Sequence, residues 1–181
     1  MIIGLAGKKQ NGKSTVADYL TVDHKFVEVS WAGPLKQIIG MGLLGLKEHQ
    51  VYGTLEDKET VDEFWGKSPR ELLQIIGTDC FRNLVDPEFW VKVGIRDINL
   101  MTNSGFDVVV SDCRFPNEIE AIKNLGGHTI KVIRDGYDAP VDEHPSETAL
   151  DGYKMDYEIT AKNVTQLLQG VDEVLDGLRK E

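Results

Sequence analysis

A glycine- and lysine-rich run, GKKQNGKST, occupies residues 7–15 and directly follows a short apolar stretch. The run has the GxxxxGK[ST] spacing of the Walker A motif, and its defining positions are held by Gly7, Gly12, Lys13 and Ser14. Glycines let several backbone N–H groups converge on a polyphosphate without a Cβ clash. The lysine reaches the β- and γ-phosphates, and the serine hydroxyl binds Mg²⁺. The motif therefore indicates binding of ATP with Mg²⁺.

The sequence on both sides of this loop supports that interpretation. Residues 2–6 (IIGLA) form a short apolar run that predicts a strand, and Val16, Ala17 and Leu20 give the following residues the apolar face of a helix. The N-terminus of such a helix directs its dipole at a bound anion. The alternative is a glycine-rich turn that carries a lysine by coincidence. A preceding strand and a following helix are the context that confirms a phosphate-binding loop, so nucleotide binding is favoured.

A carboxylate and two arginines follow other predicted strands. Residues 106–112 (FDVVVSD) form a nearly continuous apolar run that ends in Asp112, as in a central parallel strand whose carboxyl end lies at the ligand edge of the sheet. In P-loop proteins this carboxylate orders Mg²⁺, although it could instead cap the next turn. Arg114 follows at once, and the predicted strand at 128–133 leads into Arg134. Both guanidinium groups are therefore expected near the phosphates.

A further arginine stands where a helix would ordinarily disfavour it. Ser68, Pro69 and Glu71 have the types of an N-cap, a first helical residue and a capping-box partner. Arg70 then lies in the first turn, where a positive charge opposes the helix macrodipole. It is either a solvated side chain or a residue that binds an anion.

The elements that must position these groups alternate along the chain. Strands are predicted at 2–6, 25–31, 106–112, 128–133 and 155–160, and helices start near Lys13, Pro34, Ser68, Asp86 and Pro116 and after Asn163. Three glycines within 35–46 weaken the second helix, and residues 47–67 suggest an exposed loop with some helix. The alternation predicts a parallel, doubly wound α/β sheet.

Length and charge limit the possible functions. With 181 residues the chain suits one α/β domain, and 20 basic against 30 acidic residues give a net charge of −10. This sign is unfavourable for a nucleic-acid polymer or an anionic membrane. Cys80 and Cys113 lack metal-ligand spacing, and a secreted chain of this size would usually carry more disulfides, so a reducing cytoplasm is favoured. The short N-terminal apolar run is neither a signal peptide nor a membrane span.

The chain resembles the deoxynucleoside monophosphate kinases of bacteriophages, within the P-loop nucleoside monophosphate kinase fold. The likeness spans nearly the whole length and is carried by residues 4–20, AGPLK at 32–36, SPRELLQIIGTDCFR at 68–82, SDCRFPNE at 111–118 and HPSE at 144–147. It implies a three-layer α/β/α fold with a five-stranded parallel sheet in a single domain. Within that domain it implies a mobile monophosphate-binding region at about 34–86 and a lid-like loop at about 134–154.

The resemblance also implies roles for individual residues. ATP would be bound by Gly7, Asn11, Gly12, Lys13, Ser14 and Thr15, and Mg²⁺ by Ser14 and Asp112. The deoxynucleoside monophosphate would be bound by Lys36, Arg70, Gln74, Thr78, Asp79, Arg82 and Glu147. Catalysis would rest on Lys13, Arg114 and Arg134. The expected activity is transfer of the ATP γ-phosphoryl group to the monophosphate, in a monomer or homodimer in the cytoplasm, or the host cytoplasm for a phage-encoded chain.

Two other functions are compatible with a P-loop. One is a kinase for a hydroxyl acceptor, such as a nucleoside, a shikimate-like compound or a coenzyme-A precursor, which would need a carboxylate base such as Asp112 or Asp79. The other is a nucleotide-binding regulator without turnover. A monophosphate acceptor needs no base, because its second phosphate pKa is about 6 and the attacking oxygen is already ionised near pH 7. For such an acceptor, arginines matter more than carboxylates, and this chain has candidates in Arg70, Arg114 and Arg134.

Overall fold

The computed structural model describes residues 1–137 and 144–180, which form two compact units. The first unit comprises Met1–Val29 and Gly94–Glu181, and the second comprises Ser30–Val93. The boundary between them falls within helix α5 (Phe89–Asn103). The region at about 34–86, predicted to bind the monophosphate, lies inside the second unit. Of the predicted lid at about 134–154, residues 138–143 lie outside the described residues.

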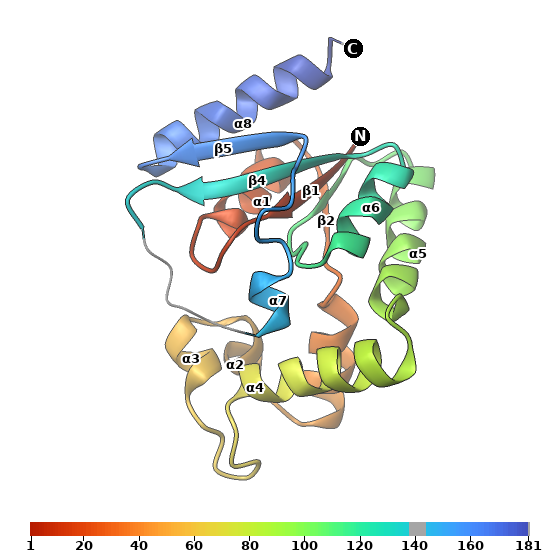
Figure 1. Cartoon of the computed structure of the whole chain (residues 1–181), viewed down its shortest axis with the longest axis vertical. Helices are drawn as coiled ribbons and strands as arrows, with labels where there is room; N and C mark the ends of the chain where they lie inside the picture. Colours follow the sequence, from red (N-terminus) through yellow and green to blue (C-terminus); the bar gives the residue numbers. More distant parts are fainter. Residues whose placement is uncertain (138–143, 181) are drawn as a thin grey trace. The chain divides into compact units, whose positions relative to one another are not determined.

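The first unit contains a five-stranded sheet in which every pairing is parallel, as predicted (Figure 1). The order is β2-β3-β1-β4-β5. The strands are β1 (Ile2–Ala6), β2 (Val27–Val29), β3 (Val108–Val110), β4 (His128–Arg134) and β5 (Tyr157–Ala161). Strand β1 is central and buried along its whole length, so the loop that follows it leaves the middle of the sheet.

Strand β2 is shorter than the predicted 25–31 for a local reason. Lys25 adopts a left-handed φ of 64°, and the Phe26 N–H donates to the Leu20 carbonyl at 3.0 Å instead of to a neighbouring strand. Lys25 and Phe26 therefore belong to the turn that follows the first helix. The ladder begins at Val27, whose backbone pairs beside β3.

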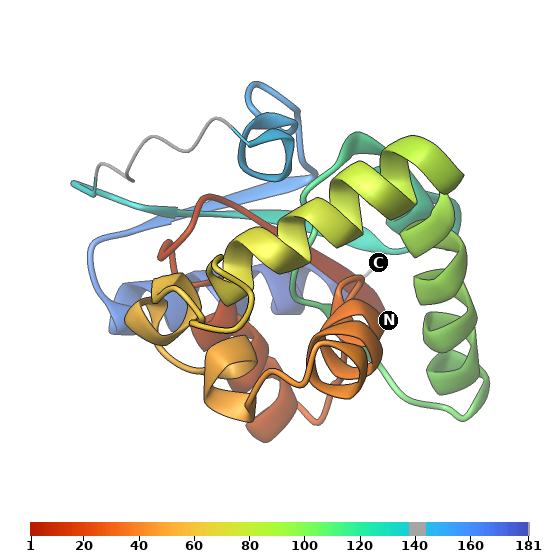
Figure 2. The ribbon, with the colours of Figure 1, turned by 90° about the horizontal axis from the view of Figure 1, so that it is seen from below.

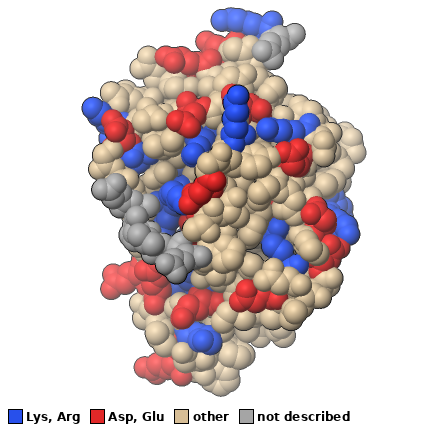
Figure 3. Space-filling model, viewed as in Figure 1, with Lys and Arg blue, Asp and Glu red and all other residues tan. Residues whose placement is uncertain are grey.

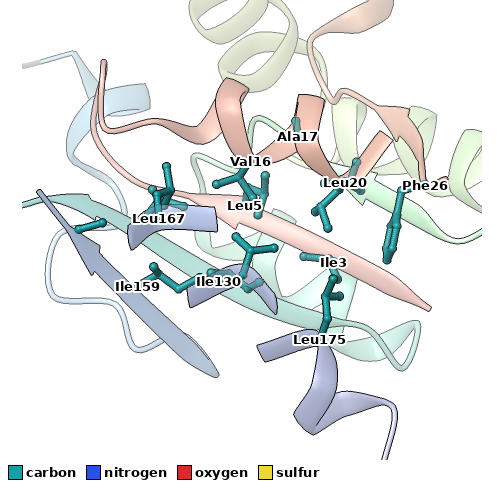
Figure 4. Close-up of a cluster of buried hydrophobic side chains, with 14 residues drawn as sticks. Ile3, Leu5, Val16, Ala17, Leu20, Phe26, Ile130, Ile159, Leu167 and Leu175 are labelled. Atoms are coloured by element: carbon teal, nitrogen blue, oxygen red, sulfur yellow. The ribbon is translucent and has the colours of Figure 1, made fainter. Parts of the chain in front are cut away.

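Helices cover both faces of this sheet. Helices α1 (Lys13–Val22) and α8 (Val164–Leu178) pack on one face, where Leu5, Leu20 and Ile130 meet Leu167 and Leu175 (Figure 4). Helix α6 (Pro116–Asn124) packs on β1 and β4, and a Cβ on Gly4 would meet Ile122 there at 3.1 Å. As predicted, α8 begins after Asn163, whose side chain accepts from the Gln166 N–H at 3.0 Å. Val164, the first residue of this helix, is 56% exposed.

The second unit is helical. It contains η1 (Leu35–Leu43), α2 (Glu48–Tyr52), α3 (Leu55–Glu59), α4 (Pro69–Gln74), η2 (Ile75–Val85) and the beginning of α5. The predicted capping box is confirmed, since the Ser68 hydroxyl accepts from the Glu71 N–H at 3.2 Å and the Glu71 carboxylate accepts from the Ser68 N–H at 2.8 Å. Leu46, Val51 and Leu72 form a small core.

Two segments of this unit, η1 and η2, have π-helical hydrogen bonding. Figure 2 shows that η2 continues α4 without a break in the ribbon. Glycines let the two segments approach each other, because a Cβ on Gly77 would lie 2.5 Å from Leu35 and a Cβ on Gly40 would lie 3.2 Å from Leu73. Extended π-turns are rare and are often found at functional sites. Of the predicted acceptor-side residues, Lys36 lies in η1, and Thr78, Asp79 and Arg82 lie in η2.

Basic and acidic side chains are mixed on the surface. On the face drawn in Figure 3, Lys and Arg are interspersed with Asp and Glu instead of gathered into one basic tract. Within 1–137 and 144–180, no helix is both long and apolar enough to cross a bilayer.

Candidate functional site

The loop between β1 and α1 has the backbone that the glycine pattern predicts. Gly7 and Gly12 have φ values of 140° and 100°, where side chains are strained. A Cβ on Gly7 would lie 2.4 Å from the Val132 carbonyl oxygen, so this position has no room for another residue. Gln10 also adopts a positive φ of 63°, although it is not a glycine. Its side chain accepts a hydrogen bond from the Tyr137 hydroxyl.

Lys13 directs its ammonium group into this loop. Its Nζ donates to the carbonyl oxygens of Gly7 at 2.7 Å and of Lys8 at 2.9 Å. The pKa of Lys13 is lowered from 10.5 to about 8, chiefly by burial and next by the charge of Arg114, while the charges of Glu147 and Asp112 oppose the shift. Asp112, Arg114 and Glu147, all predicted for the site, therefore act electrostatically on Lys13 across long separations in the sequence.

Arg114 is held by two carboxylates. Its backbone N–H donates to Glu118 Oε2 at 2.7 Å, and its Nη1 donates to Glu147 Oε1. The Glu147 side chain is only 5% exposed, against 31% for Arg114. Glu118 is 3% exposed, and its carboxylate also accepts from the Phe115 N–H at 3.1 Å. Glu118 was not among the residues predicted for the site, although an acidic residue two positions after Pro116 is a helix-start signal.

A cavity of about 540 Å³ opens beside the loop within the first unit. Its lining includes Gly7, Lys8, Asn11, Arg114, Arg134 and Glu147. Lys8 donates to the Glu147 carbonyl oxygen at 2.9 Å and forms an ion pair with Asp151. Arg134, at the end of β4, stacks its guanidinium 5.2 Å from the centre of the Tyr137 ring. The cavity thus joins the loop to the carboxyl end of β4 and to α7 (Pro145–Thr148).

The oxygen donors predicted for Mg²⁺ lie at the same end of the sheet. Ser14 is in the first turn of α1, and Asp112 follows β3 close enough to influence Lys13. The described ranges contain no group of three or more His, Cys, Asp or Glu side chains arranged to hold a metal. A single carboxylate with a hydroxyl suits Mg²⁺, which usually takes one or two protein oxygens and completes its shell with water and substrate phosphates.

The residues predicted to bind the acceptor all lie in the second unit, except Glu147. Lys36 is in η1, Arg70 and Gln74 are in α4, and η2 carries Thr78, Asp79 and Arg82. Thr78 and Arg82 are buried, whereas Asp79 is exposed. Arg82 Nη1 donates to the Pro87 carbonyl oxygen at 3.4 Å.

Lys58, in α3, is a further basic residue of this group that sequence reasoning missed. Burial lowers the pKa of Lys58, and the charges of Lys36 and Arg70 lower it further. Lys36 and Arg70, which come from two other helices, therefore each repel Lys58, although Lys36 also lies 5.3 Å from the centre of the Tyr52 ring. Such a cluster is suited to binding an anion. No local pattern marked Lys58, because it lies in the acidic stretch that was predicted to be mainly an exposed loop.

A solved structure supports the fold. The crystal structure of TT1252 from Thermus thermophilus superposes with a TM-score of 0.51 over 98% of this chain and 96% of that chain, at 15% sequence identity. At this identity the likeness concerns the fold alone.

Sequence comparisons identify the family. The family model for deoxynucleotide monophosphate kinase matches residues 57–170. The "Putative deoxynucleotide monophosphate kinase" of Acanthamoeba polyphaga mimivirus is 41% identical over 90% of this chain and 88% of its own length. The deoxynucleotide monophosphate kinase of Enterobacteria phage T4 is 26% identical over 82% of this chain and 87% of its own length. The chain belongs to the deoxynucleotide monophosphate kinase family.

Proposed function

We propose that this chain transfers the γ-phosphoryl group of ATP, bound with Mg²⁺, to a deoxynucleoside 5′-monophosphate. Phosphotransferase activity on deoxynucleotide monophosphates follows from its family, and the proposal adds the donor, the metal and the roles of the residues. The observation that supports it best is the Walker A loop with Lys13 inside it and Arg114 and Asp112 within electrostatic reach. The phage and viral relatives support the host cytoplasm as the place of action.

On the donor side, the N-terminus of α1 and the N–H groups of the loop bind the phosphates, since both present positive partial charge to an anion. Gly7, Asn11 and Gly12 shape the loop, and Lys13 contacts the β- and γ-phosphates. Ser14 and Asp112 would hold the nucleotide's Mg²⁺, and Thr15 would contact the ATP phosphates. When bound, that ion neutralises part of the charge that develops on the phosphates.

The transfer itself needs positioning and charge stabilisation more than proton removal. An oxygen of the acceptor phosphate attacks the γ-phosphorus, the bond to the β,γ-bridging oxygen breaks, and ADP leaves with that electron pair. Arg114 and Arg134 line the cavity beside the loop and are positioned to stabilise charge on the transferred group. Because the acceptor oxygen is already ionised near pH 7, no carboxylate has to act as a base.

On the acceptor side, Lys36, Lys58 and Arg70 would bind the dianionic 5′-phosphate. Gln74, Thr78, Asp79 and Arg82 would contact the rest of the monophosphate. The repulsion of Lys58 by Lys36 and by Arg70 supports this assignment, because a bound dianion would relieve it.

The activity is tested with a panel of deoxy- and ribonucleoside monophosphates, each supplied with ATP and Mg²⁺ while diphosphate formation is measured. Hydroxyl acceptors, such as the corresponding nucleosides, form the comparison arm. We expect diphosphates from deoxynucleoside monophosphates and no product from nucleosides. Phosphorylation of the nucleosides alone would identify a hydroxyl kinase, and nucleotide binding without any product would identify a regulator.

The lowered pKa of Lys13 predicts that nucleotide affinity depends on pH. Polyphosphate binding favours the charged lysine, so the pKa of Lys13 in the complex is higher than the value of about 8 in the free chain. Above pH 8 the free chain loses this proton and must take it up again on binding. Affinity for ATP with Mg²⁺ should therefore fall as pH rises above 8, by up to about tenfold per pH unit.

Calorimetric titrations at pH 8.5 in two buffers of different ionisation enthalpy measure this proton uptake. Lys13→Arg is the matched control, because a guanidinium does not titrate in this range. Equal proton uptake by the two proteins would assign the effect to another group.

Two substitutions test the acceptor side. Arg70→Ala and Lys58→Ala should each raise the KM for the monophosphate by about tenfold or more, while the KM for ATP changes little, because each removes a charge from the acceptor phosphate alone. Lys47→Ala is the control, since this lysine is exposed in the same unit. Steady-state kinetics with each substrate varied in turn give both constants, and equal changes in the two would contradict the assignment.

A further inference from the structure

Arg114 contacts two buried carboxylates that come from different segments of the chain. Glu118 belongs to α6 and accepts from the Arg114 backbone N–H at 2.7 Å. Glu147 belongs to α7, 33 residues away from Arg114, and accepts from the guanidinium. One carboxylate therefore holds the backbone of Arg114, and the other holds the far end of its side chain.

A gain in stability does not explain why these two carboxylates are buried. Removing a carboxylate from water is costly, and a buried ion pair contributes little more to stability than well-packed apolar side chains of similar size. Glu118 offsets its cost with two backbone N–H groups at the start of α6, where negative charge is also favoured by the helix dipole. Glu147 has a different environment, because its carboxylate meets the guanidinium that faces the cavity beside the loop.

Their combined effect is to restrict Arg114. A free arginine side chain carries rotamer entropy of about 2 kcal/mol, so without partners its guanidinium would occupy many positions. Phosphoryl transfer depends on charge placed in advance where the transition state needs it, and a misplacement of about 1 Å can cost a factor of about 100. A guanidinium has five N–H donors, so contact with one carboxylate is compatible with contact to a phosphate.

We propose that Glu118 and Glu147 are positioning residues of the phosphoryl-transfer step and that both act through Arg114. The proposal rests on the role of Arg114 given under the proposed function. It changes the role predicted for Glu147, which becomes a partner of the catalytic arginine instead of a contact to the acceptor. Glu118 gains a role that the helix start alone does not imply.

The experiment is a double-mutant cycle. Glu118→Ala and Glu147→Gln are made in the natural chain and in an Arg114→Ala chain, and labelled ATP is used so that low rates are resolved. In the natural background each substitution should lower kcat by about tenfold or more, with the KM values for both substrates within about threefold of the original. In the Arg114→Ala background the same substitutions should cause no further loss, because the group on which they act is gone.

Two variants complete the design. Glu118→Gln keeps an acceptor oxygen for the backbone N–H groups and should retain most of kcat. If Glu118→Ala fails to fold, Glu147→Gln carries the cycle. Glu120→Gln is the matched control on the same helix, where its carboxylate accepts from the Tyr153 hydroxyl and should leave kcat unchanged.

The contrary outcomes have distinct meanings. Equal losses of kcat in both backgrounds would show that the carboxylates act independently of Arg114, and a lower melting temperature with unchanged kcat would show a structural role only. An increase in the monophosphate KM alone after Glu147→Gln would restore Glu147 as an acceptor contact. Full activity of the Arg114→Ala chain would overturn the role of Arg114 and this proposal with it, whereas the substrate panel tests the activity separately.

Discussion

Replacement of Lys13 by methionine is expected to abolish phosphoryl transfer while the chain remains folded. The ammonium group of Lys13 lies inside the loop, bonded to the carbonyl oxygens of Gly7 and Lys8, where the β- and γ-phosphates would replace these partners. Arginines that neutralise a transferred phosphoryl group contribute factors of about 10³ or more to kcat, and Lys13 would bring a positive charge to the same phosphates. Diphosphate formation measured with labelled ATP should therefore fall to the background rate.

The melting temperature of the Lys13→Met protein separates catalysis from folding. Burial lowers the pKa of Lys13 to about 8, which means that folding disfavours its charged form. At pH 7 the lysine is mostly charged in both the folded and the unfolded chain. Burying this charge lowers the free energy of unfolding, and methionine removes that cost. The variant should melt at the same temperature as the natural chain or higher. Substantial turnover by a folded variant would overturn the P-loop assignment.

Replacement of Arg114 by lysine is expected to lower kcat by about tenfold or more, with ATP binding largely retained. Lysine keeps the positive charge but not the planar group whose fixed N–H donors can contact Glu147 and an equatorial phosphate oxygen together. Because the loss concerns an interaction made in the transition state, kcat and kcat/KM should fall together. Replacement by alanine should cause the larger loss of the two.

Melting temperature and kcat are measured on the same preparation of the Arg114→Lys protein. If Arg114 served only as the ion-pair partner of Glu147, the substitution would change thermal stability and leave kcat nearly unchanged. Arg96→Lys is a suitable control, since this arginine is exposed and pairs with its neighbour Asp97. A destabilised but fully active Arg114→Lys protein would remove Arg114 from the catalytic residues.

Local sequence signals determined a large part of this structure. The loop at Gly7 and Gly12 was predictable because only glycine tolerates its dihedral angles and its approach to Val132. The helix starts at Ser68 and Asn163 were predictable because a capping side chain bonds to backbone N–H groups within three residues. The parallel sheet followed from the alternation of apolar strands with amphipathic helices, which restricts topology strongly.

Tertiary structure decided the features that depend on residues far apart in the sequence. The contact between Arg114 and Glu147 joins segments 33 residues apart. The charges that lower the pKa of Lys58 lie on two other helices. Residue type and spacing do not predict such contacts, because the contacts depend on how whole helices and strands pack. The close approach of η1 and η2 at Gly77 and Leu35 likewise joins residues far apart in the sequence. The motifs thus predicted the chemical groups of the site from local rules, whereas the burial and partners that set their charge and orientation required the folded chain.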